Sequence, residues 1–140
     1  MKKILLFFIM MQSISMIAKT EIDTITNWQL YKNNKILFKS NEFERGSKIG
    51  IINLKDNFKV LNFNIFYDSF RDETFKKIEF IIDKKVIQYA EDKNYACSAF
   101  KIKREQIIRL FEKYKNATIL LKYYDKINPK GIIIGRILIK

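Results

Sequence analysis

The sequence contains no histidine among its 140 residues. Imidazole is the general base of most serine and cysteine triads and a common ligand of zinc, so these sites are excluded. A hydrolase would have to use carboxylates, and a glycosidase holds two carboxyl groups roughly 5 to 9.5 Å apart. Asp68, Asp72 and Glu73 are the candidates, but they share one predicted loop, where acids are ordinarily solvated. We therefore expect no enzyme activity, with a small carboxylate-dependent hydrolase as the alternative.

Cysteine, glycine and proline are also scarce. Cys97 is the only cysteine, so the chain forms no internal disulfide, and its place in a predicted strand indicates a buried thiol. The four glycines lie singly at 46, 50, 131 and 135, which excludes a phosphate-cradling loop and a dinucleotide fingerprint. The acids lack the spacing of a calcium-binding EF-hand. We expect neither a cofactor nor a metal.

The first eighteen residues have the pattern of an export signal. Lys2 and Lys3 precede an apolar run over residues 4–11, which is shorter than the roughly 20 residues that span a bilayer. Cleavage after Ala18 is our choice, and cleavage after Ser15 or an uncleaved anchor are the alternatives. The rest, residues 19–140, is predicted to form one domain, periplasmic or secreted. The lysine-led signal and the bias toward Lys, Ile and Asn suggest a bacterial chain.

Short stretches of alternating apolar and polar residues dominate the remainder. They predict a mostly β fold, an antiparallel β-sandwich of about nine short strands, with a curled β-barrel as the alternative. The longest strand is expected over residues 58–68. The others are expected over residues 28–31, 35–40, 49–54, 75–82, 86–90, 95–102, 118–124 and 132–139.

One segment, residues 103–115, has helical periodicity. Its apolar residues recur at Ile107, Phe111 and Tyr114, and Asn116 suits a left-handed position after the last turn. The strands over residues 118–124 and 132–139 are apolar on both faces, which predicts a second sheet on one face and this helix on the other.

Basic residues are in excess, with a formal net charge of +12. Without residues 1–18, which hold two lysines and no acid, 25 basic and 15 acidic residues leave +10. Lysine supplies most of this charge, and lysine acts as a point charge rather than as a fork for bases or phosphates. An AT-rich genome would also inflate lysine on solvated faces. The candidate polyanion-binding residues are Lys76, Lys77, Lys84, Lys85, Lys101, Lys103, Arg104, Lys113 and Lys115.

These observations favour an exported, non-enzymatic binding module. We expect a monomer whose partner is a protein or an anionic envelope polymer, engaged through a strand edge or the lysine-rich face. Sequence-specific nucleic-acid binding is not expected, because the chain has no recognition-helix motif and no RNA-binding aromatic signature.

Overall fold

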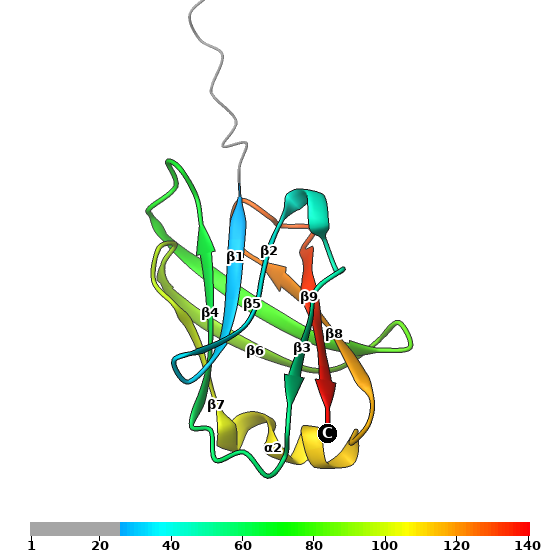
Figure 1. Cartoon of the computed structure of the whole chain (residues 1–140). Helices are drawn as coiled ribbons and strands as arrows, with labels where there is room; N and C mark the ends of the chain where they lie inside the picture. The colour runs from blue at the N-terminus through cyan, green and yellow to red at the C-terminus, as the bar shows by residue number, and fades with distance from the viewer. Residues whose placement is uncertain (1–25) are drawn as a thin grey trace, which may run out of the picture.

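The computed structural model describes residues 26–140, which form two facing β-sheets and one α-helix (Figure 1). The four-stranded sheet has the order β2-β1-β4-β7, and the five-stranded sheet has the order β3-β9-β8-β5-β6. The predicted sandwich of nine strands and one helix is therefore confirmed, and two separate sheets form in place of one curled barrel. The predicted export signal lies outside the described residues.

The strands follow the alternation of the sequence. Their bounds are β1 (Asn27–Lys32), β2 (Lys35–Asn41), β3 (Ile49–Ile52), β4 (Val60–Phe66), β5 (Glu73–Ile82), β6 (Lys85–Tyr95), β7 (Phe100–Lys103), β8 (Thr118–Tyr124) and β9 (Ile132–Ile139). A 3-10 turn, η1 (Glu42–Glu44), follows β2, and the helix is α2 (Arg104–Lys113).

The core lies between the two sheets and consists of the inward side chains of each strand. Trp28 on β1 is fully buried, and its indole nitrogen donates a 2.6 Å hydrogen bond to the carbonyl oxygen of Ile134 on β9, which ties one sheet to the other. Phe63 on β4 packs against Tyr123 on β8 with 5.0 Å between ring centroids. Large aromatic side chains thus supply contacts that a chain without disulfides needs.

Two features of the strands differ from the prediction. The longest strand is β6, with eleven residues, and β4 has seven. Residues 91–94 have low strand propensity and were expected to form a loop, but their pairing with β5 extends to Glu73 opposite Tyr95, so pairing overrides propensity. In addition, β3 and β9 pair in parallel, whereas every other pair of described strands is antiparallel.

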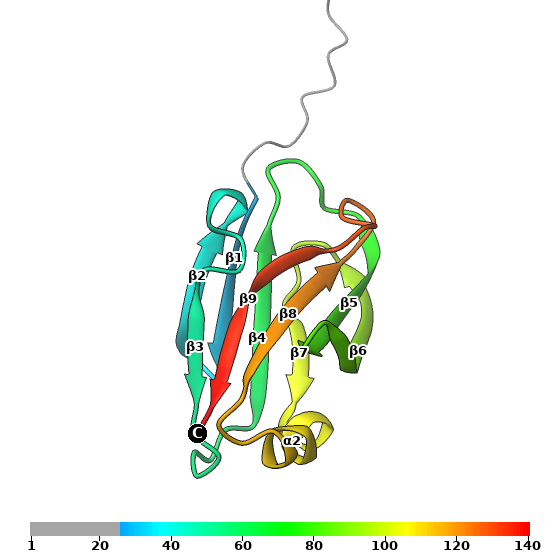
Figure 2. The ribbon, with the colours of Figure 1, turned by 90° about the vertical axis from the view of Figure 1, so that its right-hand side faces the viewer.

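The helix lies at one end of the sandwich, below the strands in Figures 1 and 2, where it closes the space between the sheets. Ile107, Leu110 and Phe111 are its buried residues, and the ring of Phe111 meets that of Phe80 on β5 edge-on at 6.4 Å. The prediction that the helix covers the outer face of β8 and β9 is wrong. Asn116 has a φ of 66°, which confirms the left-handed position expected after the helix.

Candidate functional site: a groove between β6 and β7

The largest cavity described is a groove of about 880 Å3 between β6 and the segment formed by β7 and the first turn of α2. It opens where both sheets end, because β6 is the last strand of one sheet and β7 the last strand of the other. With only four residues, β7 is too short to cover the eleven residues of β6, none of which is buried. The groove is lined by Phe58, Lys59, Val60, Glu91, Asp92, Lys101, Lys103, Arg104, Glu105, Gln106 and Ile108.

The two sides of this groove carry opposite charges. On β6 the acid on the inward side is Asp92, whereas the neighbouring Glu91 lies opposite Lys77 on the outer side of the sheet. Lys101 and Lys103 belong to β7 on the other side of the groove. Arg104 begins the helix beside them, with its guanidinium 5.6 Å from the ring centroid of Phe58. Such a groove favours a ligand that presents both signs of charge, since either sign alone would be repelled by one side.

One hydrogen bond crosses the groove, and two more fix the side formed by β7 and α2. The Gln88 side-chain amide of β6 donates to the carbonyl oxygen of Gln106 in the first turn of α2, at 2.6 Å. The backbone N–H of Arg104 donates to the carbonyl oxygen of Lys59 at 2.9 Å. The Gln106 side-chain oxygen accepts from the backbone N–H of Lys103 at 2.7 Å and caps the helix. The groove is thus part of the folded structure.

The structure brings together three of the nine predicted polyanion-binding residues, Lys101, Lys103 and Arg104, in this groove. The others lie elsewhere. Lys84 lies in the turn between β5 and β6, and Lys85 begins β6. Lys113 and Lys115 lie at the end of the helix, and Lys77 points outward from β5, where its ammonium donates to Glu79 at 2.8 Å. The predicted set therefore does not form one continuous face.

Lys76 is buried, so its predicted place on an exposed hairpin face is wrong. The side chain is 1% exposed, and its ammonium donates to the carbonyl oxygens of Tyr95 at 2.7 Å, Ala96 at 3.2 Å and Ser98 at 2.6 Å. Burial lowers the pKa of Lys76, and the nearby charge of Asp92 opposes this shift. Lys76 therefore holds the connection between β6 and β7 in place.

Cys97 lies in that connection, and the prediction of a buried thiol is also wrong. The expected strand over residues 95–102 is interrupted by a turn after Tyr95, and β7 begins only at Phe100. Cys97 falls in this turn and is exposed.

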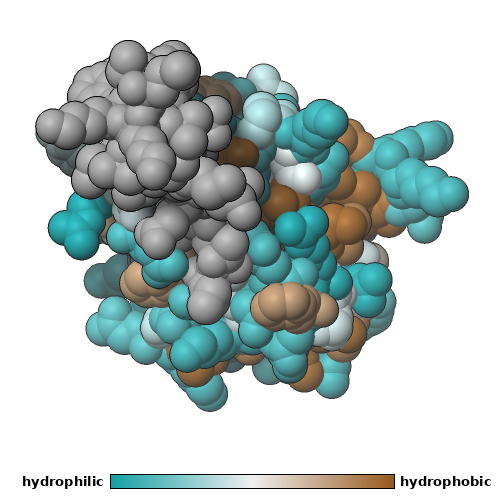
Figure 3. All heavy atoms as spheres, turned by 90° about the horizontal axis from the view of Figure 1, so that it is seen from above, coloured by the Kyte–Doolittle hydropathy of each residue, from teal (hydrophilic) through white to brown (hydrophobic). Residues whose placement is uncertain are grey.

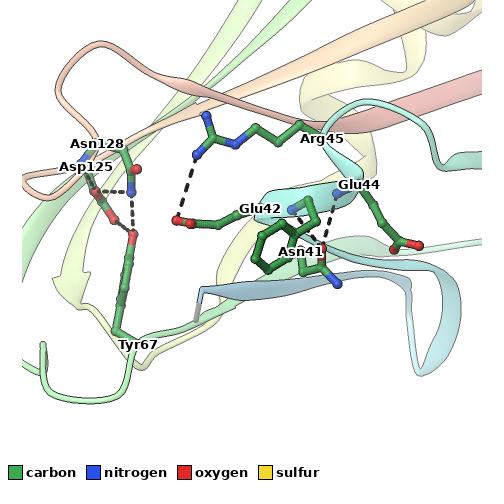
Figure 4. Close-up of polar contacts among 8 residues, drawn as sticks. Asn41, Glu42, Glu44, Arg45, Tyr67, Asp125 and Asn128 are labelled. Atoms are coloured by element: carbon green, nitrogen blue, oxygen red, sulfur yellow. Dashed lines mark hydrogen bonds and ion pairs between the residues drawn. The ribbon is translucent and has the colours of Figure 1, made fainter. Parts of the chain in front are cut away.

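A second polar cluster surrounds Asp125 at the opposite end of the sandwich (Figure 4). Asp125 is 5% exposed; one carboxylate oxygen accepts from the hydroxyls of Tyr67 and Tyr123, the latter at 2.9 Å. The other accepts from the backbone N–H of Ile127 at 3.0 Å and of Asn128 at 2.8 Å. Burial and the neighbouring Asp125 charge raise the pKa of Tyr123. With this many donors the carboxylate is fully engaged, and the cluster closes the connection between β8 and β9.

The predicted carboxylates lie outside the groove. Asp68, Asp72 and Glu73 are exposed, none of them lines the groove, and Glu73 forms an ion pair with Lys93 at 3.2 Å. Among residues 26–140, no three metal-ligating side chains cluster, and no helix has the length and apolar character needed to cross a bilayer.

No protein-family model and no curated protein matches the sequence.

The groove is lined by several residues that the sequence did not single out as candidates, above all Phe58, Lys59, Glu91 and Asp92. The two acids were assigned to a loop, because their strand is defined only by pairing with β5.

Proposed function

We propose that this protein is an exported interaction module that binds an extended polypeptide segment in the groove between β6 and β7. The observation that carries the proposal is the edge of β6, an eleven-residue strand that pairs on only one side within the described chain and borders the groove. An unpaired strand edge offers alternating backbone donors and acceptors to a further strand, which is the basis of strand addition.

The charges of the groove favour a polypeptide over a polyanion. Asp92 would repel an anionic polymer that follows the inward side of β6, whereas a peptide can place acidic side chains toward Lys101 and Lys103 and a basic one toward Asp92. Val60 and Ile108 add apolar surface for alternate side chains. Backbone pairing would then supply affinity, and the charged sides would supply selectivity.

A display library of random peptides of about twelve residues, selected on the immobilised protein, tests this proposal. Binding of a selected, fluorescently labelled peptide is then measured by anisotropy. Lys101→Glu/Lys103→Glu should weaken binding by about tenfold or more, as expected for close charge pairs. The matched control, Lys84→Glu/Lys85→Glu, makes the same charge change at exposed lysines outside the groove and should leave affinity within about twofold.

Backbone pairing is tested with the same peptide methylated at alternate amide nitrogens. Methylation on the register that faces β6 should abolish binding, and methylation on the other register should not. If both lysine variants lose affinity equally, or if dextran sulfate binds the groove and displaces the peptide at low concentration, general charge attraction would explain the data and the proposal would fail.

A further inference from the structure

The outer face of the five-stranded sheet carries aliphatic side chains that the fold leaves uncovered. One row crosses all five strands through the register Ile49, Arg136, Leu120, Ile81 and Val86. Ile51 and Leu138 continue it in the next row, and Ile133 lies on the same face. We call this set, without Arg136, the aliphatic face: Ile49, Ile51, Ile81, Val86, Leu120, Ile133 and Leu138.

The aliphatic face is accessible to solvent. Ile49 is 51% exposed, Ile51 47%, Val86 50% and Ile133 36%. Figure 2 looks onto β3, β9 and β8 and shows no element of the described chain in front of them, because α2 lies at the end of the sandwich. In Figure 3, hydrophobic side chains gather on the side of the molecule where Figure 1 places these strands. The outer face of β8 and β9 is thus apolar, as the sequence indicated, but no element of the described chain packs on it.

Cationic side chains border and interrupt the aliphatic face. Lys84, in the turn, and Lys85, opposite Ile82 at the end of the sheet, lie at the edge of the face beside Val86. Lys122 follows Leu120 on the same side of β8, and Arg136 lies within the first row. The acids on this side of the sheet are Asp83, in the turn beside Lys84, Glu79 and Glu91. Glu79 already accepts hydrogen bonds from Lys77 at 2.8 Å and from the hydroxyl of Tyr124 at 2.6 Å, and Glu91 lies opposite Lys77 on β5. The surroundings of the aliphatic face are therefore net positive.

We propose that the aliphatic face docks on the surface of an anionic lipid bilayer. Its aliphatic side chains enter the headgroup region, while the bordering lysines contact lipid phosphates. Protein interfaces are enriched in aromatic residues and depleted in lysine, whereas the seven residues of the aliphatic face include no aromatic residue and are bordered by lysines. Lysine suits a bilayer because its aliphatic stem lies along apolar surface while its ammonium reaches the charged layer. The face shares no lining residue with the groove, so this proposal does not depend on the first.

Flotation with large unilamellar vesicles tests the proposal, using the chain from Lys19, which retains every described element. Vesicles of phosphatidylcholine alone are compared with vesicles containing about one-third phosphatidylglycerol, at about 0.15 M salt. We expect binding to the anionic vesicles and little to the neutral ones. Lys84→Gln/Lys85→Gln should lower affinity for the anionic vesicles by about tenfold.

Two matched double variants separate insertion from charge attraction. Ile49→Ser/Ile51→Ser should weaken binding by about tenfold or more, since each methylene placed in the bilayer raises affinity by about fourfold. Ile36→Ser/Ile127→Ser replaces isoleucines that are equally exposed, at 47% and 46%, outside the aliphatic face, and should change affinity by less than about twofold. Equal effects of the two variants would overturn the proposal. So would a dimer in light scattering that Ile49→Ser/Ile51→Ser dissociates, because the face would then bind a second copy.

Discussion

Replacing Lys76 should destabilise the protein more than replacing any exposed lysine. The substitution Lys76→Met keeps most of the side-chain volume and removes the ammonium that donates to three carbonyl oxygens at 2.6 to 3.2 Å. Hydrogen bonds to a charged group contribute about 1.5 to 3 kcal/mol each, whereas burying an ammonium costs several kcal/mol. The variant recovers the cost of burial but removes this donor from the carbonyl oxygens of Ala96 and Ser98, whereas that of Tyr95 still accepts from the backbone N–H of Ser98 at 2.9 Å. We expect a net loss of about 3 to 5 kcal/mol in the free energy of unfolding.

Urea denaturation followed by tryptophan fluorescence measures this loss, because Trp28 lies fully buried between the sheets. The matched control is Lys77→Met, the same substitution one residue further along β5. The Lys77 side chain points to the outer face and pairs with Glu79, with the two side chains 27% and 14% exposed. Its removal should cost less than about 1 kcal/mol.

The comparison between these neighbours decides the interpretation. If Lys76→Met costs less than about 1 kcal/mol, or no more than Lys77→Met, the ammonium does not hold the connection after β6. An unchanged slope of unfolding free energy against urea would show that the variant still unfolds as one cooperative unit.

Three further outcomes are expected. Burial lowers the pKa of Lys76 below its ordinary value of 10.5, so the folded chain loses this proton at a lower pH than the unfolded chain does. The free energy of unfolding of the wild type, relative to that of Lys76→Met, should therefore rise with pH toward 10.5 in urea titrations. A difference that stays constant with pH would contradict the lowered pKa. Cys97 is exposed, so Ellman's reagent should label one thiol per native chain without denaturant, and labelling only after unfolding would contradict its position. Phe111→Ala should lower the free energy of unfolding by about 3 to 5 kcal/mol in the same urea assay, because the ring is fully buried against Phe80. A decrease below about 1 kcal/mol would mean that the helix does not close the core.

Local patterns in the sequence predict the strands well because alternation determines which side chains face inward. The same alternation could have placed Lys76, since Ile78 and Phe80 are inward and residues two apart on a strand share a face. The prediction placed Lys76 on an exposed face because of its charge, although its position in the alternation indicates an inward side chain. A lysine at an inward position of a strand is thus a signal of a buried ammonium with backbone acceptors, and it is readable from sequence alone.

Other features depend on contacts that no local pattern contains. The parallel pairing of β3 with β9 joins segments more than eighty residues apart, at Ile49 and Arg136. The strand character of Glu91 and Asp92 comes from their partners on β5. The groove is lined jointly by residues at the start of β4 and in β6, β7 and α2, and only tertiary packing brings these segments together, so its residues could not have been grouped from the sequence.

Both proposed surfaces have one physical origin, which is that the described chain has more sheet than it can cover. The four-stranded sheet ends in a four-residue strand, and the edge of β6 stays unpaired within the described chain and borders the groove. The single ten-residue helix is used at the end of the sandwich, where Phe111 completes the core, and is therefore not available for the outer face of β8 and β9. Packing of the core explains why the aromatic residues between the sheets are buried. It does not explain the exposed strand edge or the exposed aliphatic face, and both are liabilities because they promote aggregation in an isolated protein. Binding partners at these two surfaces would offset both liabilities, and the lysines beside each surface indicate where such partners would make contact.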